Sequence, residues 1–192
     1  MIRTKQFQLL ILFAAVILLF SGCSHSPKPA NQPSHRSADP AGAQTLTGRV
    51  VRVADGDTVT VLDSSNSQRR IRLEGIDAPE SHQAFGTQSK KNLSEMIFGK
   101  DVMVVYQKTD QYGRLVGRIT VEGKDVNLEQ LKAGMAWHYK EYQREQAPED
   151  RDLYAKAENE AHAARRGLWQ DADPVEPSAF RKEKKRERQD AR

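Results

Sequence analysis

The sequence has a single cysteine among its 192 residues, Cys23. Because there is no second cysteine, no disulfide can form within the chain, and a folded domain must be held together by its hydrophobic core. Histidine is also scarce. The five histidines, at positions 25, 35, 82, 138 and 162, show none of the paired spacings that are typical of zinc ligands. Their arrangement argues against a zinc site.

The sequence also lacks an apolar run of the roughly 18 residues that a membrane-spanning helix needs. Its longest apolar run is Leu9–Phe20. Two basic residues precede this run and two small residues follow it: Arg3, Lys5, Ser21 and Gly22. This order is typical of a secretory signal, and a short retained membrane anchor is the alternative. We therefore expect residues 1–23 to be a signal peptide.

The segment Phe20-Ser21-Gly22-Cys23 resembles the lipobox of bacterial lipoproteins. In that family the cysteine is lipidated and becomes the mature N-terminus. The first lipobox position is usually leucine and is Phe20 here, so ordinary cleavage with a free thiol is the alternative. The lipobox interpretation predicts an exported cell-envelope lipoprotein, anchored in a membrane through Cys23 on the periplasmic or extracellular face.

Residues 24–43 contain four prolines among small and polar residues and no large aliphatic side chain. Such a segment buries too little apolar area to offset the entropy of ordering, so we expect a flexible tether. The folded domain is expected over residues 44–170, without internal repeats. Residues 171–192 are charged and lack a hydrophobic stripe, which predicts disorder or a frayed helix.

The positive charge of the chain is concentrated at its C-terminal end. The whole chain has a formal charge of +4, and residues 181–192 hold seven basic and three acidic side chains, a surplus of +4. The high pI is therefore a property of the tail, and a nucleic-acid site in the domain requires locally placed arginines. The tail itself could hold substrate or anionic lipid. We favour a solvated charged end.

Apolar alternation and β-branched residues predict five strands. They cover approximately residues 46–53, 58–62, 70–74, 102–106 and 115–121. Helical spacing of apolar residues, with a glycine after each segment, predicts three helices over residues 86–98, 126–133 and 150–166. This α+β order suits a small five-stranded barrel of the oligonucleotide-binding type (OB-fold), because closure removes exposed strand edges.

Three carboxylates lie at predicted turns. Asp57 follows Asp55-Gly56 at the start of the second strand, and Asp77 and Glu80 lie on either side of Pro79. Proline restricts the backbone of this corner, and antiparallel pairing would bring Asp57 close to Asp77. A group of oxygen ligands suits a hard cation, calcium or magnesium. Taken alone, each motif is also compatible with an ordinary turn or helix cap.

Two arginines accompany these carboxylates. Arg72 lies in the third strand, and Arg114 follows Asp110-Gln111-Tyr112-Gly113 at the start of the fifth. The planar guanidinium group matches two phosphate oxygens, and a charge directed into a small barrel requires a partner or a ligand. The alternatives are that Arg72 pairs with a nearby carboxylate such as Glu74, and that Arg114 is a solvated turn residue.

Together, these motifs resemble the staphylococcal (micrococcal) nuclease or thermonuclease family. The resemblance runs from about Leu46 to Trp169. It rests on three ordered motifs, Asp55-Gly56-Asp57-Thr58, Arg72 to Glu80, and Asp110 to Arg114. Further support comes from Val126-Asn127, Leu131, Gly134 and Gly167-Leu168-Trp169. Several ordered motifs at compatible spacings are far more specific than any one of them.

The resemblance implies a five-stranded barrel with three helices and one calcium ion. It implies metal ligands at Asp57, Asp77 and the backbone carbonyl of Ala78, where the family often has threonine. It also implies hydrolysis of both DNA and RNA that leaves 3′-phosphates. We expect a monomer with no obligate protein partner.

The resemblance further implies catalytic roles for three side chains. Glu80 matches the glutamate usually assigned as the general base on water, and Arg72 and Arg114 match the two arginines that grip the scissile phosphate. A divalent cation and two guanidinium groups would stabilise the charge that develops on the phosphate oxygens. These roles predict a calcium-dependent phosphodiesterase without sugar specificity.

Three tyrosines are candidate substrate-binding residues. Tyr112 is retained in its motif, and Tyr139 and Tyr142 could stack on a base or hydrogen-bond a terminal phosphate. Core packing is the alternative for Tyr139. Two departures from the family should weaken non-specific attraction to a polyanion: Ser81–Ser89 is short and has no lysine, and Gln111 replaces a lysine.

The main alternative to an enzyme is a binding module. Domains of this barrel exist that have lost the catalytic residues and bind only protein or nucleic acid, so the fold alone does not decide. A structural envelope lipoprotein is a second alternative. The presence of all three carboxylates and both arginines favours the nuclease.

Overall fold

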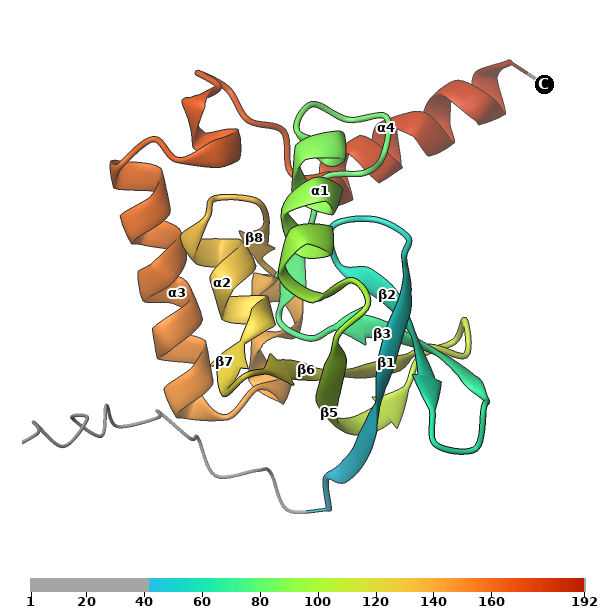
Figure 1. Cartoon of the computed structure of the whole chain (residues 1–192). Helices are drawn as coiled ribbons and strands as arrows, with labels where there is room; N and C mark the ends of the chain where they lie inside the picture. The colour runs from blue at the N-terminus through green and yellow to red at the C-terminus, as the bar shows by residue number, and fades with distance from the viewer. Residues whose placement is uncertain (1–41, 192) are drawn as a thin grey trace, which may run out of the picture. The chain divides into compact units, whose positions relative to one another are not determined.

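The computed structural model describes residues 42–191 (Figure 1). The predicted signal peptide, the proposed lipidation site Cys23 and nearly all of the predicted tether lie outside the described residues. Within residues 42–191, no helix has the length and apolar character needed to cross a membrane.

Five long strands close into a barrel, as the sequence predicted. The strands are β1 (Gln44–Val53), β2 (Thr58–Asp63), β3 (Gln68–Leu73), β5 (Asp101–Thr109) and β6 (Leu115–Val121). Neighbours in the order β3-β2-β1-β5-β6 are antiparallel, and β3 closes the barrel by pairing with β6 in parallel. A short strand, β7 (Lys124–Asp125), extends the sheet beyond β6, and β4 (Ile76–Asp77) pairs separately with β8 (Trp137–His138).

The barrel is filled by the apolar face of each strand. Ile71 and Leu73 of β3 are fully buried, and so are Val59 and Val61 of β2. Each such side chain contributes about 2 kcal/mol through the apolar area that it buries. Because successive residues of a strand point to opposite faces, the arginine between Ile71 and Leu73 must lie on the outer face of the barrel. The expectation that this charge is directed into the barrel is therefore wrong. The same alternation that fills the core therefore places Arg72 at the site.

Helices cover one side of the barrel. They are α1 (Gly86–Ile97), α2 (Val126–Lys132), α3 (Pro148–Ala163) and α4 (Pro177–Asp190), with two short 3₁₀ helices, η1 (Lys140–Glu145) and η2 (Gly167–Gln170). The first three correspond to the predicted helices. The fourth occupies the C-terminal segment for which we expected disorder or a frayed helix. Figure 1 shows α4 leading away from the barrel beyond α1.

The glycines of the C-terminal motifs allow two chain segments to touch. Gly134 follows α2 with a φ of +66°, and a Cβ atom there would lie 2.2 Å from the carbonyl oxygen of Arg166. A Cβ atom on Gly167 would lie 2.1 Å from the carbonyl oxygen of Gly134. Only glycine permits this approach. It packs Trp169 against Trp137, with ring centroids 4.4 Å apart.

A buried asparagine supports the turn that carries the candidate site. Asn127 of α2 is fully buried, and its Oδ1 accepts a hydrogen bond from the amide of Ile119 at 3.2 Å. Its Nδ2 donates to the carbonyl oxygens of Glu74 at 3.0 Å and Gly117 at 3.2 Å. These bonds join α2 to β6 and to the turn between β3 and β4. The position of Asp77 on β4 therefore depends on a side chain from α2.

Candidate active site

A cleft of about 600 Å³ gathers the candidate site residues that lie in the described part of the chain. It is lined by the β1–β2 turn, the segment from β3 through Glu80, the β5–β6 turn, η1 and Arg181 of α4. The lining includes all nine candidates: Asp57, Arg72, Asp77, Ala78, Glu80, Tyr112, Arg114, Tyr139 and Tyr142. Five separate sequence segments thus meet at one depression, and four of them carry the nine candidates.

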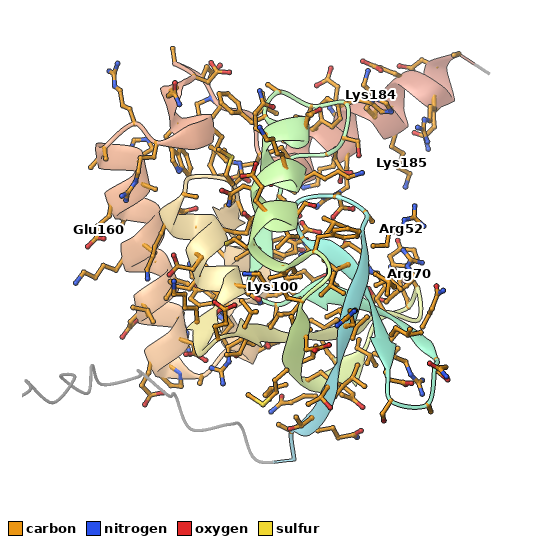
Figure 2. The ribbon with its side chains drawn as sticks, viewed as in Figure 1. Arg52, Arg70, Lys100, Glu160, Lys184 and Lys185 are labelled. Carbon is orange, nitrogen blue, oxygen red and sulfur yellow. The ribbon has the colours of Figure 1, made fainter. Side chains whose placement is uncertain are left out.

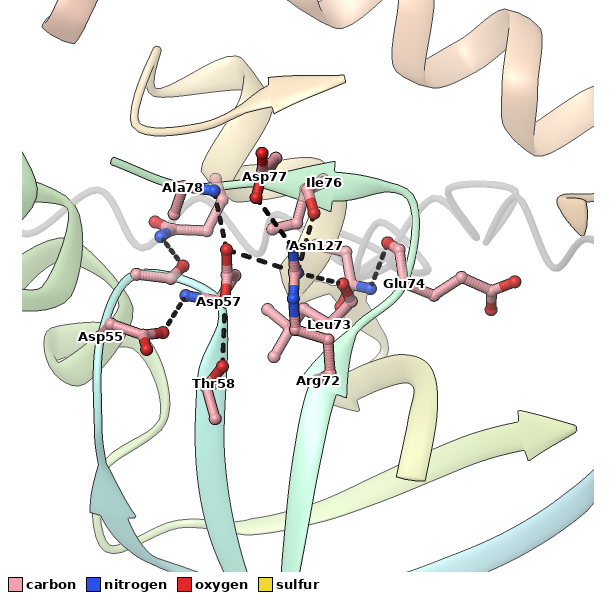
Figure 3. A network of polar contacts seen from close by, with 12 residues as sticks. Asp55, Asp57, Thr58, Arg72, Leu73, Glu74, Ile76, Asp77, Ala78 and Asn127 are labelled. Atoms are coloured by element: carbon pink, nitrogen blue, oxygen red, sulfur yellow. Dashed lines mark hydrogen bonds and ion pairs between the residues drawn. The ribbon is translucent and has the colours of Figure 1, made fainter. Parts of the chain in front are cut away.

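Asp57 is fixed in the tight turn between β1 and β2 (Figure 3). Its amide donates to Asp55 Oδ1 at 3.0 Å, and its Oδ2 accepts from the amide of Ala78 at 2.7 Å. Gly56 is required here because a Cβ atom would lie 1.9 Å from Ser89 Oγ. Burial, and then the charge of Asp57, raises the pKa of Asp55 to about 6. The turn therefore holds two acidic groups close together and partly out of water.

Arg72 links the two buried aspartates. Its Nη2 donates to Asp77 Oδ1 at 3.0 Å, and its Nη1 lies 3.3 Å from Asp57 Oδ2. Nη1 also donates to the carbonyl oxygens of Leu73 and Ile76, both at 2.8 Å (Figure 3). The partners of Arg72 are thus the two aspartates of the site, and the alternative pairing with Glu74 is wrong.

Arg114 is held beside Thr58 by the β5–β6 turn. Its Nε donates to Asp110 Oδ2 at 2.7 Å, and its Nη1 lies 3.4 Å from Thr58 Oγ1. Burial opposes the charge on Asp110, but hydrogen bonds from Arg114 and Tyr112 outweigh it and lower the pKa of Asp110. The side chain of Arg114 is only 21% exposed. It is therefore a fixed group facing the cleft, and the alternative of a solvated turn residue is wrong.

The tyrosines form a partly exposed aromatic wall. Tyr139 and Tyr142 pack with ring centroids 4.9 Å apart, and Lys108 lies over the ring of Tyr142. Tyr112 is largely exposed, and the guanidinium carbon of Arg114 lies 5.4 Å from its ring centroid. Tyr139 is half-buried and lines the cleft, so it is not a core residue.

An arginine that the sequence did not single out completes the site. Arg181, in the first half of α4, donates to Asp77 Oδ1 at 3.2 Å and Oδ2 at 2.9 Å. It also donates to Glu80 Oε1 at 2.9 Å. Burial raises the pKa of Asp77, and the hydrogen bonds from Arg181 and the charge of Arg72 oppose that shift. In the sequence, Arg181 is simply one of the basic residues of the tail, because no local motif connects it to residues 104 and 101 positions earlier.

The donor set of the cleft fits a hard divalent cation. Within residues 42–191, no three His, Cys, Asp or Glu side chains are already gathered as metal ligands. Instead, the positively charged guanidinium group of Arg181 forms ion pairs with Asp77 and Glu80. Two buried aspartates with a third carboxylate nearby are costly without positive charge beside them. Carboxylate and carbonyl oxygens are the ligands that calcium and magnesium prefer.

Comparisons with known proteins agree with this geometry. Residues 70–171 match the family model described as staphylococcal nuclease homologue. The chain is 41% identical to an "uncharacterized endonuclease" of Haemophilus influenzae, over 72% of this chain and 75% of the relative. It is 42% identical to an "uncharacterized endonuclease" of Escherichia coli, over 72% of this chain and 87% of the relative. It is 37% identical to a "micrococcal nuclease" of Shigella flexneri, over 72% of this chain and 82% of the relative.

Proposed function

Because the chain belongs to the staphylococcal nuclease family, we propose that its cleft hydrolyses the phosphodiester backbone of both DNA and RNA in a calcium-dependent reaction that leaves 3′-phosphates. The observation that supports this most is the meeting of Asp57, Asp77 and Glu80 with two arginines in one cleft. A chain that only bound nucleic acid would not need buried carboxylates beside the phosphate, because they repel it.

We assign the cation to the floor of the cleft. Asp57, Asp77 and the carbonyl oxygen of Ala78 would hold it, and it would supply positive charge beside the phosphate oxygens. Arg72 keeps the two aspartates together, because its donors are committed to them and to two main-chain carbonyls. We therefore assign Arg72 a role in positioning the ligands in addition to attracting the phosphate.

Arg114 is the arginine best placed to contact the scissile phosphate. Its Nε is fixed by Asp110, and its Nη1 has only a long contact with Thr58 among residues 42–191. A guanidinium group held in this way can bind developing negative charge without reorganising. Tyr112, Tyr139 and Tyr142 line the same cleft and offer surfaces on which bases can stack.

Glu80 is the proposed general base. Its side chain is 39% exposed at the edge of the cleft, so water can reach it. A carboxylate beside the attacking water can accept its proton as the bond to phosphorus forms. Pro79 precedes it, and Glu80 N donates to Gln83 Oε1 at 3.1 Å, which fixes the direction of this corner.

Cleavage assays of the full chain test this proposal. End-labelled single-stranded DNA and RNA would be incubated with calcium, with magnesium and with chelator, and phosphatase treatment of the products would reveal 3′-phosphates. We expect cleavage of both substrates in calcium, none in chelator, and loss of most activity in Glu80→Gln. Glu122→Gln, on an exposed turn, is the matched control. A folded chain that cuts nothing would indicate a binding module.

We also propose that residues 1–23 direct export and that Cys23 anchors the chain in a cell-envelope membrane as a monomeric lipoprotein. The proposal is supported only by the sequence pattern of this segment. Labelling of expressing cells with a radioactive fatty acid tests it. Label should enter the wild-type chain and not Cys23→Ala, and an unlabelled wild type would rule out the anchor.

A further inference from the structure

Helix α4 has two differently charged faces. A helix turns about 100° per residue, so positions i, i+3, i+4 and i+7 lie on one side. Four basic residues follow this spacing and form what we call the basic face of α4: Arg181, Lys184, Lys185 and Arg188. The three acidic residues of the helix lie together on the opposite side: Glu183, Glu187 and Asp190. A uniformly solvated charged end does not require this separation.

The first turns of α4 are fixed to the edge of the cleft. Gln83 donates to the carbonyl oxygen of Val175, just before the helix. Phe180 lines an apolar cavity of about 180 Å³ together with Phe85 and Trp137. Arg181 then reaches the cleft itself, whereas residues 182–190 are exposed. The helix therefore starts at the site and carries its basic face outward from it.

Arginines of the barrel form a second basic surface that continues from the cleft. Arg52 of β1 pairs with Thr60 of β2, and Thr60 pairs with Arg70 of β3, so these side chains share one face of the sheet. Arg72 lies two residues after Arg70 and hence on the same face. In Figure 2, Lys185 leaves α4 toward the part of the view that holds Arg52 and Arg70.

These outer basic side chains are not neutralised by the protein. Within residues 42–191, Arg52, Arg70, Lys185 and Arg188 are exposed and none of them makes an ion pair. Lys184 pairs with Glu187 at 2.8 Å, but both side chains are about half exposed, and such pairs contribute little. A row of uncompensated positive charge that begins beside a phosphate-binding cleft is complementary to a polyanion.

We propose that α4 is a substrate-binding arm, and that the single strand leaving the cleft lies between the basic face of α4 and the arginines of β1 and β3. This inference rests on the proposed function and adds to it the path of the substrate outside the cleft. From Arg181 to Arg188 the basic face spans about 10 Å along the helix axis. That length exceeds the rise of about 3.4 Å per nucleotide along one strand of duplex DNA, so the arm reaches more than one phosphate.

Binding of single-stranded DNA to the full chain in chelator tests the arm without requiring cleavage. The probe is a fluorescent 20-nucleotide strand, followed by anisotropy at several salt concentrations. The test variant is Lys185→Gln/Arg188→Gln. Lys182→Gln/Arg186→Gln is the matched control, because it removes the same charge from the same helix outside the basic face.

We expect the basic-face variant to bind the 20-nucleotide strand roughly five- to tenfold more weakly. The slope of log affinity against log salt should fall by about 1.4, since each contact with a single strand contributes about 0.7. The control variant should lose less than twofold, and a trinucleotide that fills only the cleft should bind both variants alike. Circular dichroism of both variants would verify that the helical content is unchanged.

Equal losses of DNA affinity in the two variants would overturn the proposal of a binding arm, because such losses would reflect net charge alone. Unchanged DNA binding, with loss of binding to anionic phosphatidylserine vesicles in the basic-face variant, would overturn it in favour of a membrane contact. The proposed function is tested separately by cleavage in calcium. A chain that binds as expected but never cuts would contradict the nuclease and leave the arm standing.

Discussion

The molecule has two clusters of carboxylates that are at least half withdrawn from water. The first is the floor of the cleft, with Asp57 and Asp77. The second consists of Glu74, Asp125 and Asp150, near Arg118 and Tyr154. Burial raises the pKa of Glu74 to about 7 and also raises the pKa of Asp125. By perturbed pKa alone, the second cluster is as strong a candidate for an active site as the first.

Space and partners distinguish the two clusters. The cavity lined by Glu74, Arg118 and Asp150 measures about 20 Å³, room for about one water, against about 600 Å³ for the cleft. Glu74 also borders the cleft, whereas Asp125 and Asp150 do not line it. Asp125 accepts from Tyr154 at 2.9 Å and from the amide of Leu128 at 3.0 Å, so it caps α2 and joins it to α3. The second cluster fastens helices to the barrel. Accessible space, more than a shifted pKa, indicates which buried acids perform chemistry.

The largest expected effect is the loss of cleavage on replacing Arg114, the arginine that faces the cleft. Replacing it with alanine removes a fixed positive group from the developing phosphate charge, so we expect cleavage to fall about 10²- to 10³-fold. Thermal unfolding should change little, because the side chain lies at a turn. Steady-state assays with single-stranded DNA measure the loss, and Arg49→Ala, on the outside of β1, is the control. Near-normal cleavage by Arg114→Ala would remove it from the site.

A large effect on stability is expected between the clusters, at Asn127. The variant Asn127→Ala leaves the amide of Ile119 and the carbonyl oxygens of Glu74 and Gly117 without their buried partner. We expect the free energy of unfolding to fall by about 3 kcal/mol. Urea denaturation measures this, with Asn159→Ala, at an exposed position of α3, as control. A loss below about 1 kcal/mol would show that the turn does not depend on this side chain.

Arg181 is expected to compete with the cation for Asp77. Because Arg181 occupies both oxygens of that carboxylate, Arg181→Gln should tighten calcium binding by up to about tenfold, which corresponds to roughly 1.4 kcal/mol. Calorimetric titration of the full chain measures this without substrate. Lys182→Gln removes the same charge one residue away and should change the affinity much less. Weaker calcium binding in Arg181→Gln would mean that this arginine supports the metal site.

A pH-dependent effect on stability is expected in the second cluster. Between about pH 4.5 and 7 the folded protein keeps a proton on Glu74 that the unfolded chain releases, so the free energy of unfolding should fall as pH rises through this window. The charges of Asp150 and Glu145 add to the shift, and those of Arg118 and Lys108 oppose it. Glu74→Gln should flatten this fall by up to about 3 kcal/mol.

Thermal unfolding of the wild type and of Glu74→Gln, measured at steps of half a pH unit, gives the difference in their stability at each pH. Burial raises the pKa of Asp55 to about 6, so it titrates in the same window, and the difference between variant and wild type is the diagnostic quantity. A constant difference across the window would contradict the assignment.

The sequence predicted the barrel and the nine described cleft candidates because their signals are local. Strand alternation places Ile71 and Leu73 on one face, and the Asp-Gly and Asp-x-Pro-Glu turns place carboxylates at strand ends. Arg181 was missed because its partners lie 104 and 101 positions earlier, with no periodicity to connect them.

Long-range packing also hid the role of Glu74. Its neighbours Arg118 and Asp150 come from β6 and α3, and only the closed barrel brings them together. For α4, a frayed helix was one of two expectations, but the contacts of Phe180 and Arg181 that fix its start also come from distant parts of the chain.

The most direct test compares the same chemical change in the two clusters, Glu80→Gln and Glu74→Gln, by single-turnover cleavage in calcium and by Tm. We predict that Glu80→Gln lowers the cleavage rate at least about 10²-fold with Tm nearly unchanged. Glu74→Gln should shift Tm and leave the rate within about twofold of wild type. A catalytic loss in Glu74→Gln, with normal cleavage by Glu80→Gln, would contradict the assignment of the cleft as the active site.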